Sequence, residues 1–223
     1  MVQPGNRGTA PPILYSLLHV ARADRDACVA ILPSDHYYSD EDAFTRTLES
    51  AFEIAAGQTS SVVLLGARPS GPEVEYGWIE VGAAVREALY EVQGFHEKPA
   101  FPAAEQLLQR GALWNTFVMV GHIGAFLQMA EATAPNLLKP LKASLEETHC
   151  EEEIRIPESL YDLLPPSDFS RHVLAPASER LLTLRLGEIE WHDLGHPDRV
   201  VSTLLARKAN LPEWVEGWQA MAV

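Results

Sequence analysis

Two kinds of segment alternate along the chain: short runs of apolar residues, and longer segments in which apolar residues recur every three or four positions. The apolar runs predict β-strands at residues 28–32, 61–66, 76–81, 92–97, 114–120 and 181–186. The periodic segments predict helices at residues 9–21, 39–57, 102–110, 123–132, 137–145, 158–164 and 197–207. Because strands and helices take turns, we expect an α/β fold whose mostly parallel, Rossmann-like sheet lies between two layers of helices.

Local signals mark where two of these helices begin. Thr9 is a suitable N-cap residue, and Pro11 and Pro12 follow it at early helical positions. Ser39 with Asp42 resembles a capping box, and Gly57 is suited to end the helix that follows. We therefore expect the hydroxyls of Thr9 and Ser39 to cap their helices.

Two aspartates follow two of the apolar segments. The run Cys28–Leu32 is β-compatible throughout, as in a strand of a parallel sheet that is covered on both faces, and Pro33 ends it shortly before Asp35. The segment that begins at Ile189 repeats this arrangement, so we expect a second strand that ends at Asp193. Because open α/β sheets bind ligands beyond the carboxyl ends of their strands, we expect the two carboxylates to share one cation.

Composition narrows the class of protein. The chain has 223 residues, of which 47% are hydrophobic and 22% charged, with a net charge of −14. This charge argues against a nucleic-acid partner. No apolar run has membrane-spanning length and no signal pattern opens the sequence, so we expect a cytoplasmic protein without a membrane partner. Cys28 and Cys150 are expected to be free thiols in a reducing compartment.

Several short motifs occur in a characteristic order. They are Gln3–Pro11, Leu32–His36, Tyr76–Glu80, Phe95–Pro99, Trp114–Asn115, Trp191–Gly195 and Pro197–Val200. This series resembles the sugar-phosphate nucleotidyltransferases, and most closely the mannose-1-phosphate guanylyltransferases. The resemblance extends from about residue 3 to about residue 207, so we expect a nucleotidyltransferase-like domain at 1–208.

The resemblance implies a reaction and residues for it. An oxygen of mannose-1-phosphate would attack the α-phosphorus of GTP, giving GDP-mannose and pyrophosphate, in a step that needs positioning and charge neutralisation. Asp35 and Asp193 would bind Mg²⁺, which prefers carboxylate and phosphate oxygens. Lys98 would contact the sugar phosphate, and Glu97 would accept hydrogen bonds from sugar hydroxyls. Asp35, Lys98 and Asp193 are thus the expected catalytic residues.

The remaining substrate-binding residues are also implied by the resemblance. Gly77 would let the backbone approach the sugar, and Asn115 would contact it, although Thr116-Phe117 stands where the family usually has Ser-Gly. Further expected substrate-binding residues are Arg7 and Thr9, in the segment that faces the base, with Glu80 and Trp191.

One element of the family is missing from these 223 residues. The family usually begins with a strand and a Gly-Gly-x-Gly-Thr-Arg loop, whose amides hold the triphosphate. We therefore expect an N-terminally truncated fold without its first βαβ unit, and no appreciable turnover by this chain. The alternative function is a catalytically silent protein that binds a sugar nucleotide or sugar phosphate.

Two further hypotheses concern the tail and a different chemistry. Residues 209–223 form an expected C-terminal apolar helix or tail, which would pack on the domain or form a homodimer contact; its apolar positions are Leu211, Trp214, Val215, Trp218, Met221 and Ala222. His36, His192 and His196 lie near the two aspartates in sequence. Because imidazole and carboxylate together bind transition metals, a metallohydrolase is the rival hypothesis.

Overall fold

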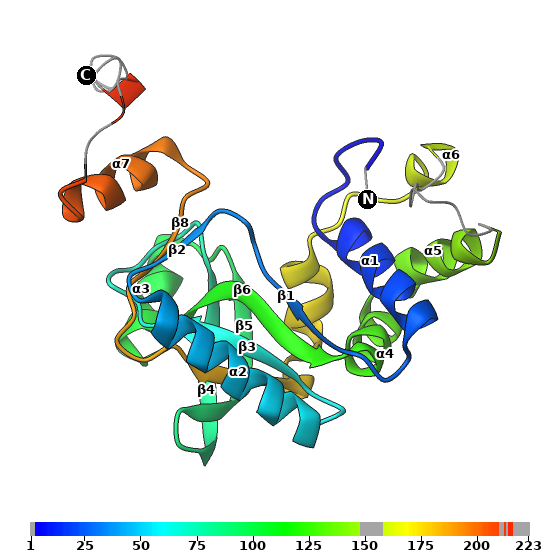
Figure 1. The fold of residues 1–223 in the computed structure, drawn as a ribbon, viewed down its shortest axis with the longest axis horizontal. Coiled ribbons are helices and arrows are strands. Elements are labelled where there is room, and N and C mark those ends of the chain that lie inside the picture. The colour runs from blue at the N-terminus through cyan, green and yellow to red at the C-terminus, as the bar shows by residue number, and fades with distance from the viewer. Residues whose placement is uncertain (1–2, 148–157, 210–211, 213, 216–223) are drawn as a thin grey trace.

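A computed structural model describes residues 3–147, 158–209, 212 and 214–215. Its central sheet has six strands in the order β1-β6-β3-β7-β5-β4. Figure 1 shows the fold with most of its elements labelled. Their bounds are β1 (Cys28–Ile31), β3 (Val62–Ala67), β4 (Gly77–Arg86), β5 (Leu89–Glu97), β6 (Leu113–His122) and β7 (Leu181–Arg185). A separate pair of short strands consists of β2 (His36–Tyr38) and β8 (Trp191–Asp193).

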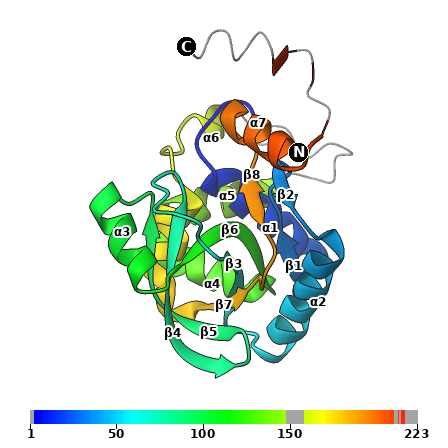
Figure 2. The ribbon, with the colours of Figure 1, turned by 90° about the vertical axis from the view of Figure 1, so that its left-hand side faces the viewer.

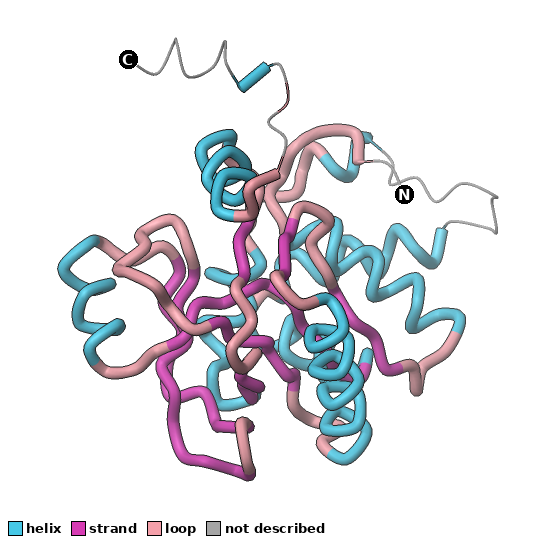
Figure 3. The backbone as a smooth tube through the Cα atoms, turned by 60° about the vertical axis from the view of Figure 1, so that its left-hand side comes forward, coloured by secondary structure: helices cyan, strands magenta, loops and turns pink. Residues whose placement is uncertain are grey.

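Helices cover both sides of the sheet, as the tube in Figure 3 shows. The α-helices are α1 (Ala10–Ala23), α2 (Glu41–Gly57), α3 (Phe101–Gln109), α4 (Ile123–Thr133), α5 (Pro135–Glu147), α6 (Glu158–Tyr161) and α7 (Pro197–Ala206). A π-helical turn, η1 (Ser170–Leu174), and a 3₁₀ segment, η2 (Ala175–Arg180), lead into β7. The α/β class and every predicted strand and helix are confirmed, and the strand expected to end at Asp193 is β8, whereas β2, η1 and η2 were not predicted.

The expectation of a mostly parallel sheet is wrong. Within the described residues, β3 and β7 form the one parallel pair, and the other pairs of the six-stranded sheet are antiparallel. Strands β1, β3 and β7 do share one direction, but β6 runs the opposite way between β1 and β3. The two-residue turn Glu87-Ala88 forces β4 and β5 to be antiparallel. Apolar runs mark buried strands without recording their direction, which is why sequence patterns missed this.

Strand β1 differs in part from the prediction of a covered strand within a parallel sheet. Both of its faces are covered, since Val29 and Ile31 pack against one hydrophobic cluster and Cys28 and Ala30 against the other. However, it is an edge strand whose four residues are only half-buried, and its described partner is the antiparallel β6. The sequence pattern was therefore right about the covered faces and wrong about a parallel strand inside the sheet.

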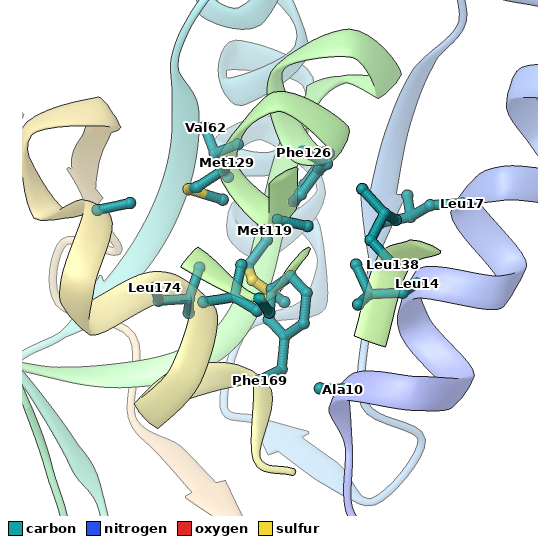
Figure 4. Close-up of a cluster of buried hydrophobic side chains, with 14 of the residues drawn as sticks. Ala10, Leu14, Leu17, Val62, Met119, Phe126, Met129, Leu138, Phe169 and Leu174 are labelled. Carbon is teal, nitrogen blue, oxygen red and sulfur yellow. The ribbon is translucent and has the colours of Figure 1, made fainter. Parts of the chain in front are cut away.

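Two hydrophobic clusters confirm the three layers. In β3, which is buried throughout, Val62 and Leu64 face one cluster and Val63 and Leu65 face the other. The first cluster joins the sheet to α1, α4, α5 and η1, as Figure 4 shows for Leu14 and other labelled side chains. The second joins it to α2 and α3. Alternation in a strand with apolar residues on both faces is what a sheet between two helical layers requires.

The predicted caps are only partly correct. Helix α1 begins after Thr9, but the Thr9 hydroxyl does not cap it. Helix α2 begins after Asp40, whose carboxylate accepts a hydrogen bond from the Ala43 amide at 2.8 Å, so Asp40 replaces the expected Ser39. The Ser39 hydroxyl instead accepts one from the Glu190 amide at 2.9 Å, which ties the entrance of α2 to the segment before β8.

Two further expectations concern membrane-spanning helices and the C-terminal tail. No helix in the described part is long and apolar enough to cross a membrane. In the expected tail, Val215 is buried and Trp214 is exposed, whereas Leu211, Trp218, Met221 and Ala222 lie outside the described residues. The proposed domain boundary at 208 and the homodimer contact stay predictions.

Candidate active site

A cavity of about 320 Å³ lies where β1 and β5 end and where β4 and β6 begin. The pair β2–β8 closes one side of it. Eight of the predicted site residues line the cavity: Thr9, Asp35, Gly77, Glu97, Lys98, Asn115, Trp191 and Asp193. Residues from nearly opposite ends of the sequence therefore meet in one place.

The two aspartates lie side by side. Strands β2 and β8 pair with His36 opposite Asp193, and the Leu194 amide donates a hydrogen bond to the Asp35 carbonyl at 2.8 Å. A Cβ placed on Gly195 would lie 2.7 Å from Asp193 Oδ1 and 3.4 Å from Asp35 Oδ2, so both carboxylates face one small space. The expected proximity is present, but a two-stranded ladder produces it, whereas the sequence analysis placed both aspartates at ends of the main sheet.

Arg199 forms an ion pair with one of the two aspartates, Asp193. Arg199 Nη1 lies 3.1 Å from Asp193 Oδ2, and its guanidinium lies 4.5 Å from the centre of the Tyr76 ring. Tyr76 in turn packs against the Trp191 ring at a centroid distance of 4.9 Å. Burial is the main cause that raises the pKa of Tyr76, so its hydroxyl stays protonated at neutral pH. Asp193 is thus oriented by groups from β8, α7 and the segment before β4.

His36 contacts Trp191, which lines the cavity beside Asp193. The indole Nε1 of Trp191 donates to His36 Nδ1 at 3.2 Å, which requires the neutral tautomer with its proton on Nε2. Burial lowers the pKa of His36, although the charges of Asp35 and Asp193 act in the opposite direction. A neutral His36 therefore supports Trp191 beside the two carboxylates.

Glu97, Gly77 and Asn115 also lie close together in the cavity lining. Gly77 is paired with Glu97 across the β4–β5 ladder. A Cβ on residue 77 would lie 2.8 Å from Glu97 Oε2 and 3.4 Å from Asn115 Cβ, so the absence of a side chain there leaves room for both neighbours. Asn115 is buried, and its side-chain oxygen accepts a hydrogen bond from the Phe117 amide at 3.1 Å. The three residues that the resemblance assigned to the sugar thus lie in one cavity.

The carboxyl group of Glu97 has a raised pKa. Burial is the main cause that raises the pKa of Glu97 to about 7, and the nearby charge of Asp168 raises it further, against the lowering effects of Lys98 and of a hydrogen bond from Ser170. Near neutral pH this group is therefore divided between its two protonation states. It can donate or accept a hydrogen bond to a hydroxyl of a ligand.

Lys98 extends into the same cavity on a constrained backbone. Its φ of +48° lies in the left-handed region, and its amide donates to the Tyr76 carbonyl at 3.3 Å. The ammonium group lies 3.7 Å from Glu75 Oε2, and the side chain is half exposed. Such a weakly paired ammonium is available to an incoming anion.

The sequence analysis missed a group around Asp168. Thr9 Oγ1 donates to Asp168 Oδ2 at 3.2 Å and accepts from the Phe169 amide at 2.8 Å, which explains why Thr9 does not cap α1. The other oxygen of Asp168 accepts from the Arg171 amide at 2.9 Å. Asp168 and Ser170 line the cavity. A polar pair just before a helical turn is too common a pattern to have indicated this role.

Phe117 also lines the cavity and departs from the expected pattern. Its φ of +59° lies in the region that favours glycine, and a bulky residue there is strained by about 1–2 kcal/mol. Its half-buried ring packs against Phe169 with centroids 6.5 Å apart. The sequence departs from the family's usual Ser-Gly at this position. Only the structure shows that this departure places an aromatic ring at the cavity wall.

Two predicted residues lie outside the cavity lining. Arg7 pairs with Asp162, with Nη2 3.3 Å from Oδ1. Glu80 pairs with His96 at 3.3 Å and with Arg110 at 3.2 Å on another part of the β4–β5 hairpin. These hydrogen bonds and charges lower the pKa of Glu80, with His96 as the largest cause. Glu80 faces away because alternate residues of a strand point to opposite sides.

The metal ligands of the rival hypothesis do not converge. Among the described residues, no three His, Cys, Asp or Glu side chains form a group that could hold a metal ion. His192 stacks on Tyr37, and His196 pairs with Asp198 at 3.1 Å. The donor set of Asp35 and Asp193 consists of two hard oxygen ligands, which fits a cation such as Mg²⁺ that takes its other ligands from phosphates and water.

Comparison with known families identifies the class of protein. The nucleotidyl transferase family matches residues 1–207, and the chain therefore belongs to this family. Mannose-1-phosphate guanylyltransferase of Escherichia coli is 24% identical over 203 residues, which are 87% of this chain and 43% of that protein. Xanthan biosynthesis protein XanB of Xanthomonas campestris pv. campestris (strain B100) is 33% identical over 129 residues, which are 57% of this chain and 27% of that protein. The chain thus spans less than half the length of these curated relatives.

Solved structures agree on the fold. The crystal structure of mannose-1-phosphate geranyltransferase from Thermus thermophilus is similar with a TM-score of 0.76 and 28% identity, covering 87% of this chain and 54% of that one. The structure of mannose-6-phosphate isomerase from Helicobacter pylori is similar in fold, with a TM-score of 0.74 and 23% identity, covering 86% of this chain and 73% of that one. Both the family and the α/β architecture expected from the sequence are confirmed.

Proposed function

We propose that this site takes part in guanylyl transfer from GTP to mannose-1-phosphate. The observation that carries the proposal is the placement of Asp35 and Asp193 side by side in the cavity that Glu97, Lys98 and Asn115 also line. Paired carboxylates, hydrogen-bonding groups and an ammonium in one cavity suit a ligand with both a charged phosphate part and a polyhydroxylated part. The names of the relatives support this choice of sugar and base.

In the proposed reaction, an oxygen of the sugar phosphate attacks the α-phosphorus of GTP. A new oxygen–phosphorus bond forms, the bond between the α-phosphorus and the bridging oxygen breaks, and pyrophosphate leaves with the electron pair. Asp35 and Asp193 would hold Mg²⁺, which when bound neutralises phosphate charge. Arg199 keeps Asp193 oriented toward that position.

A second group of residues in the cavity is proposed to position the sugar phosphate. Lys98 is proposed to contact its phosphate, and its distance of 3.7 Å from Glu75 leaves the ammonium only loosely paired. Glu97 and Asn115 are proposed to hydrogen-bond sugar hydroxyls, beside the backbone of Gly77. Thr9 and Trp191 also line the cavity, whereas Arg7 and Glu80 form ion pairs outside the lining.

The second candidate function is a binding protein without turnover. It is favoured by one feature of the 223 residues, the lack of a Gly-Gly-x-Gly-Thr-Arg segment, whose amides would neutralise the departing pyrophosphate. Loss of even one preorganised donor reduces a rate by about 100-fold or more. We accordingly propose that this chain, assayed alone, binds GDP-mannose and releases no appreciable pyrophosphate.

One experiment tests both candidates. GDP-mannose binding is measured by calorimetry with and without Mg²⁺, and pyrophosphate release from GTP and mannose-1-phosphate is measured beside a full-length homologue. Binding that is weakened by Asp193→Asn, without turnover, supports the silent binder. Turnover within about tenfold of the homologue supports the transferase and contradicts the expected inactivity. If neither activity is found, both proposals are wrong.

A further inference from the structure

A second cavity, of about 620 Å³, lies between α2, the turn of the β4–β5 hairpin and the end of β7. It shares no lining residue with the candidate active site. In Figure 2 the tip of the hairpin lies at the bottom of the molecule, and the β2–β8 pair lies in the upper half, below α7. A ligand here would therefore occupy a position separate from the proposed reaction.

Three arginines from three different elements line this cavity. Arg46 comes from α2, Arg86 from the end of β4, and Arg185 from the end of β7. None of the three forms an ion pair in the part of the chain that the structure describes. The one acidic residue that lines the cavity is Glu87. The cavity is thus basic although the protein as a whole has a net charge of −14.

Some other arginines of this protein form ion pairs. Arg68 lies 3.6 Å from a carboxylate oxygen of Glu188, and Arg110 lies 3.2 Å from one of Glu80. What distinguishes Arg46, Arg86 and Arg185 is that all three line the same cavity. All three are exposed and have no ion-pair partner in the described chain, so an anion that enters this cavity would meet three positively charged side chains.

The backbone holds this arrangement in place. Arg86 pairs with Leu89 across the hairpin turn, and Leu89 pairs with Leu184 of β7. The Arg185 amide donates to the Ala88 carbonyl at 2.9 Å, and Ala88 adopts a φ of +59° in the turn. The Arg185 guanidinium also packs over the Tyr90 ring at 5.0 Å from its centre. Arg86 and Arg185 are therefore attached to one rigid corner of the sheet.

From this geometry we propose that the cavity between α2, the hairpin and β7 binds a small molecule that carries a diphosphate or polyphosphate group. Guanidinium groups are planar forks whose paired N–H donors match phosphate oxygens, and several forks around one space favour a ligand with several phosphate charges. The volume is sufficient for such a group with an attached organic part. This proposal is independent of the proposed function, because none of its residues belongs to the other cavity.

The test uses inorganic pyrophosphate as the probe and the full chain without Mg²⁺. Calorimetry is expected to show saturable binding to the unaltered protein. The double variant Arg86→Gln/Arg185→Gln should weaken it by about tenfold or more, since each charge-assisted hydrogen bond commonly contributes that much. Arg180→Gln, which removes an arginine outside the cavity, is the matched control and should bind as the unaltered protein does. Circular dichroism verifies that each variant is folded.

A further variant separates the two cavities. Lys98→Ala alters the candidate active site and should leave pyrophosphate binding unchanged if the arginine cavity is responsible. If Lys98→Ala abolishes binding while the arginine double variant retains it, the proposal is wrong. It is equally wrong if pyrophosphate does not bind saturably, or if only a long polyanion such as single-stranded RNA binds.

Discussion

Asp193 and Arg199 face each other across the start of α7, with Oδ2 and Nη1 3.1 Å apart. The same guanidinium packs over Tyr76, and its side chain is 22% exposed, so the pair is partly shielded from water. This contact ties one of the two proposed cation ligands to the wall of the cavity. It also connects β8 with the segment before β4, which are distant in sequence.

The first prediction concerns this contact. Arg199→Gln should lower the free energy of unfolding by about 1 kcal/mol, because it removes the ion pairs with Asp193 and Glu73 and the packing on the Tyr76 ring. Urea denaturation measures the change. Arg207→Gln is the control, since Arg207 also lies over a tyrosine, Tyr37, at 5.3 Å but forms no ion pair within the described chain. An equal loss in both variants would show that the ion pairs contribute nothing.

The second prediction concerns the space between the two aspartates. Gly195→Ala should weaken Mg²⁺-dependent binding of GDP-mannose by about tenfold, because the new Cβ would meet Asp193 Oδ1 at 2.7 Å and displace it. Calorimetry with and without Mg²⁺ measures the effect. Gly71→Ala is the control, because a Cβ at that position has no heavy atom within 4 Å. Unchanged binding in Gly195→Ala would argue against a cation shared by Asp35 and Asp193.

A third prediction follows from the raised pKa of Glu97. The folded protein keeps a proton on Glu97 up to a pKa of about 7, whereas the unfolded chain loses it near the ordinary value of 4.5. Between these values the folded state binds more protons, so this group's contribution to stability falls as the pH rises from about 4.5 to about 7.

Glu97→Gln should remove this contribution to the pH dependence. The urea midpoint of the variant should therefore decrease less between about pH 5 and about pH 8 than that of the unaltered protein. Glu105→Gln, at an exposed position of α3, should retain the original dependence. Parallel pH profiles for Glu97→Gln and the unaltered protein would mean that Glu97 titrates normally.

The fourth prediction concerns the proposed contact with phosphate. Lys98→Ala should weaken binding of mannose-1-phosphate more than binding of mannose, because a point charge acts on the phosphate and not on the hydroxyls. Calorimetry with the two ligands measures the difference. Lys208→Ala is a suitable control, since Lys208 is also an exposed lysine with a positive φ, +53°, at the end of α7. Equal losses for both ligands would contradict the role assigned to Lys98.

Much of the fold could be predicted because its elements are coded locally. The apolar run that became β3 is buried on both faces, and the periodic segment that became α2 presents one apolar side to the sheet. Solvent exclusion alone selects such patterns. The motifs that contain Gly77, Glu97 and Asn115 were likewise recognisable, because each is a short stretch of sequence.

What the sequence determined by itself was therefore the kind and order of the elements, and the residue types available at their ends. Tertiary structure alone decided which of these residues meet. Asp35 and Asp193 adjoin because β2 pairs with β8. Thr9 reaches Asp168 because backbone hydrogen bonds join Arg7 and Ala10 to Ser167. Strand direction, the position of β1 at the edge and the raised pKa of Glu97 were decided in the same way. Each depends on contacts between segments far apart in the chain, which no local pattern of apolar and polar residues records.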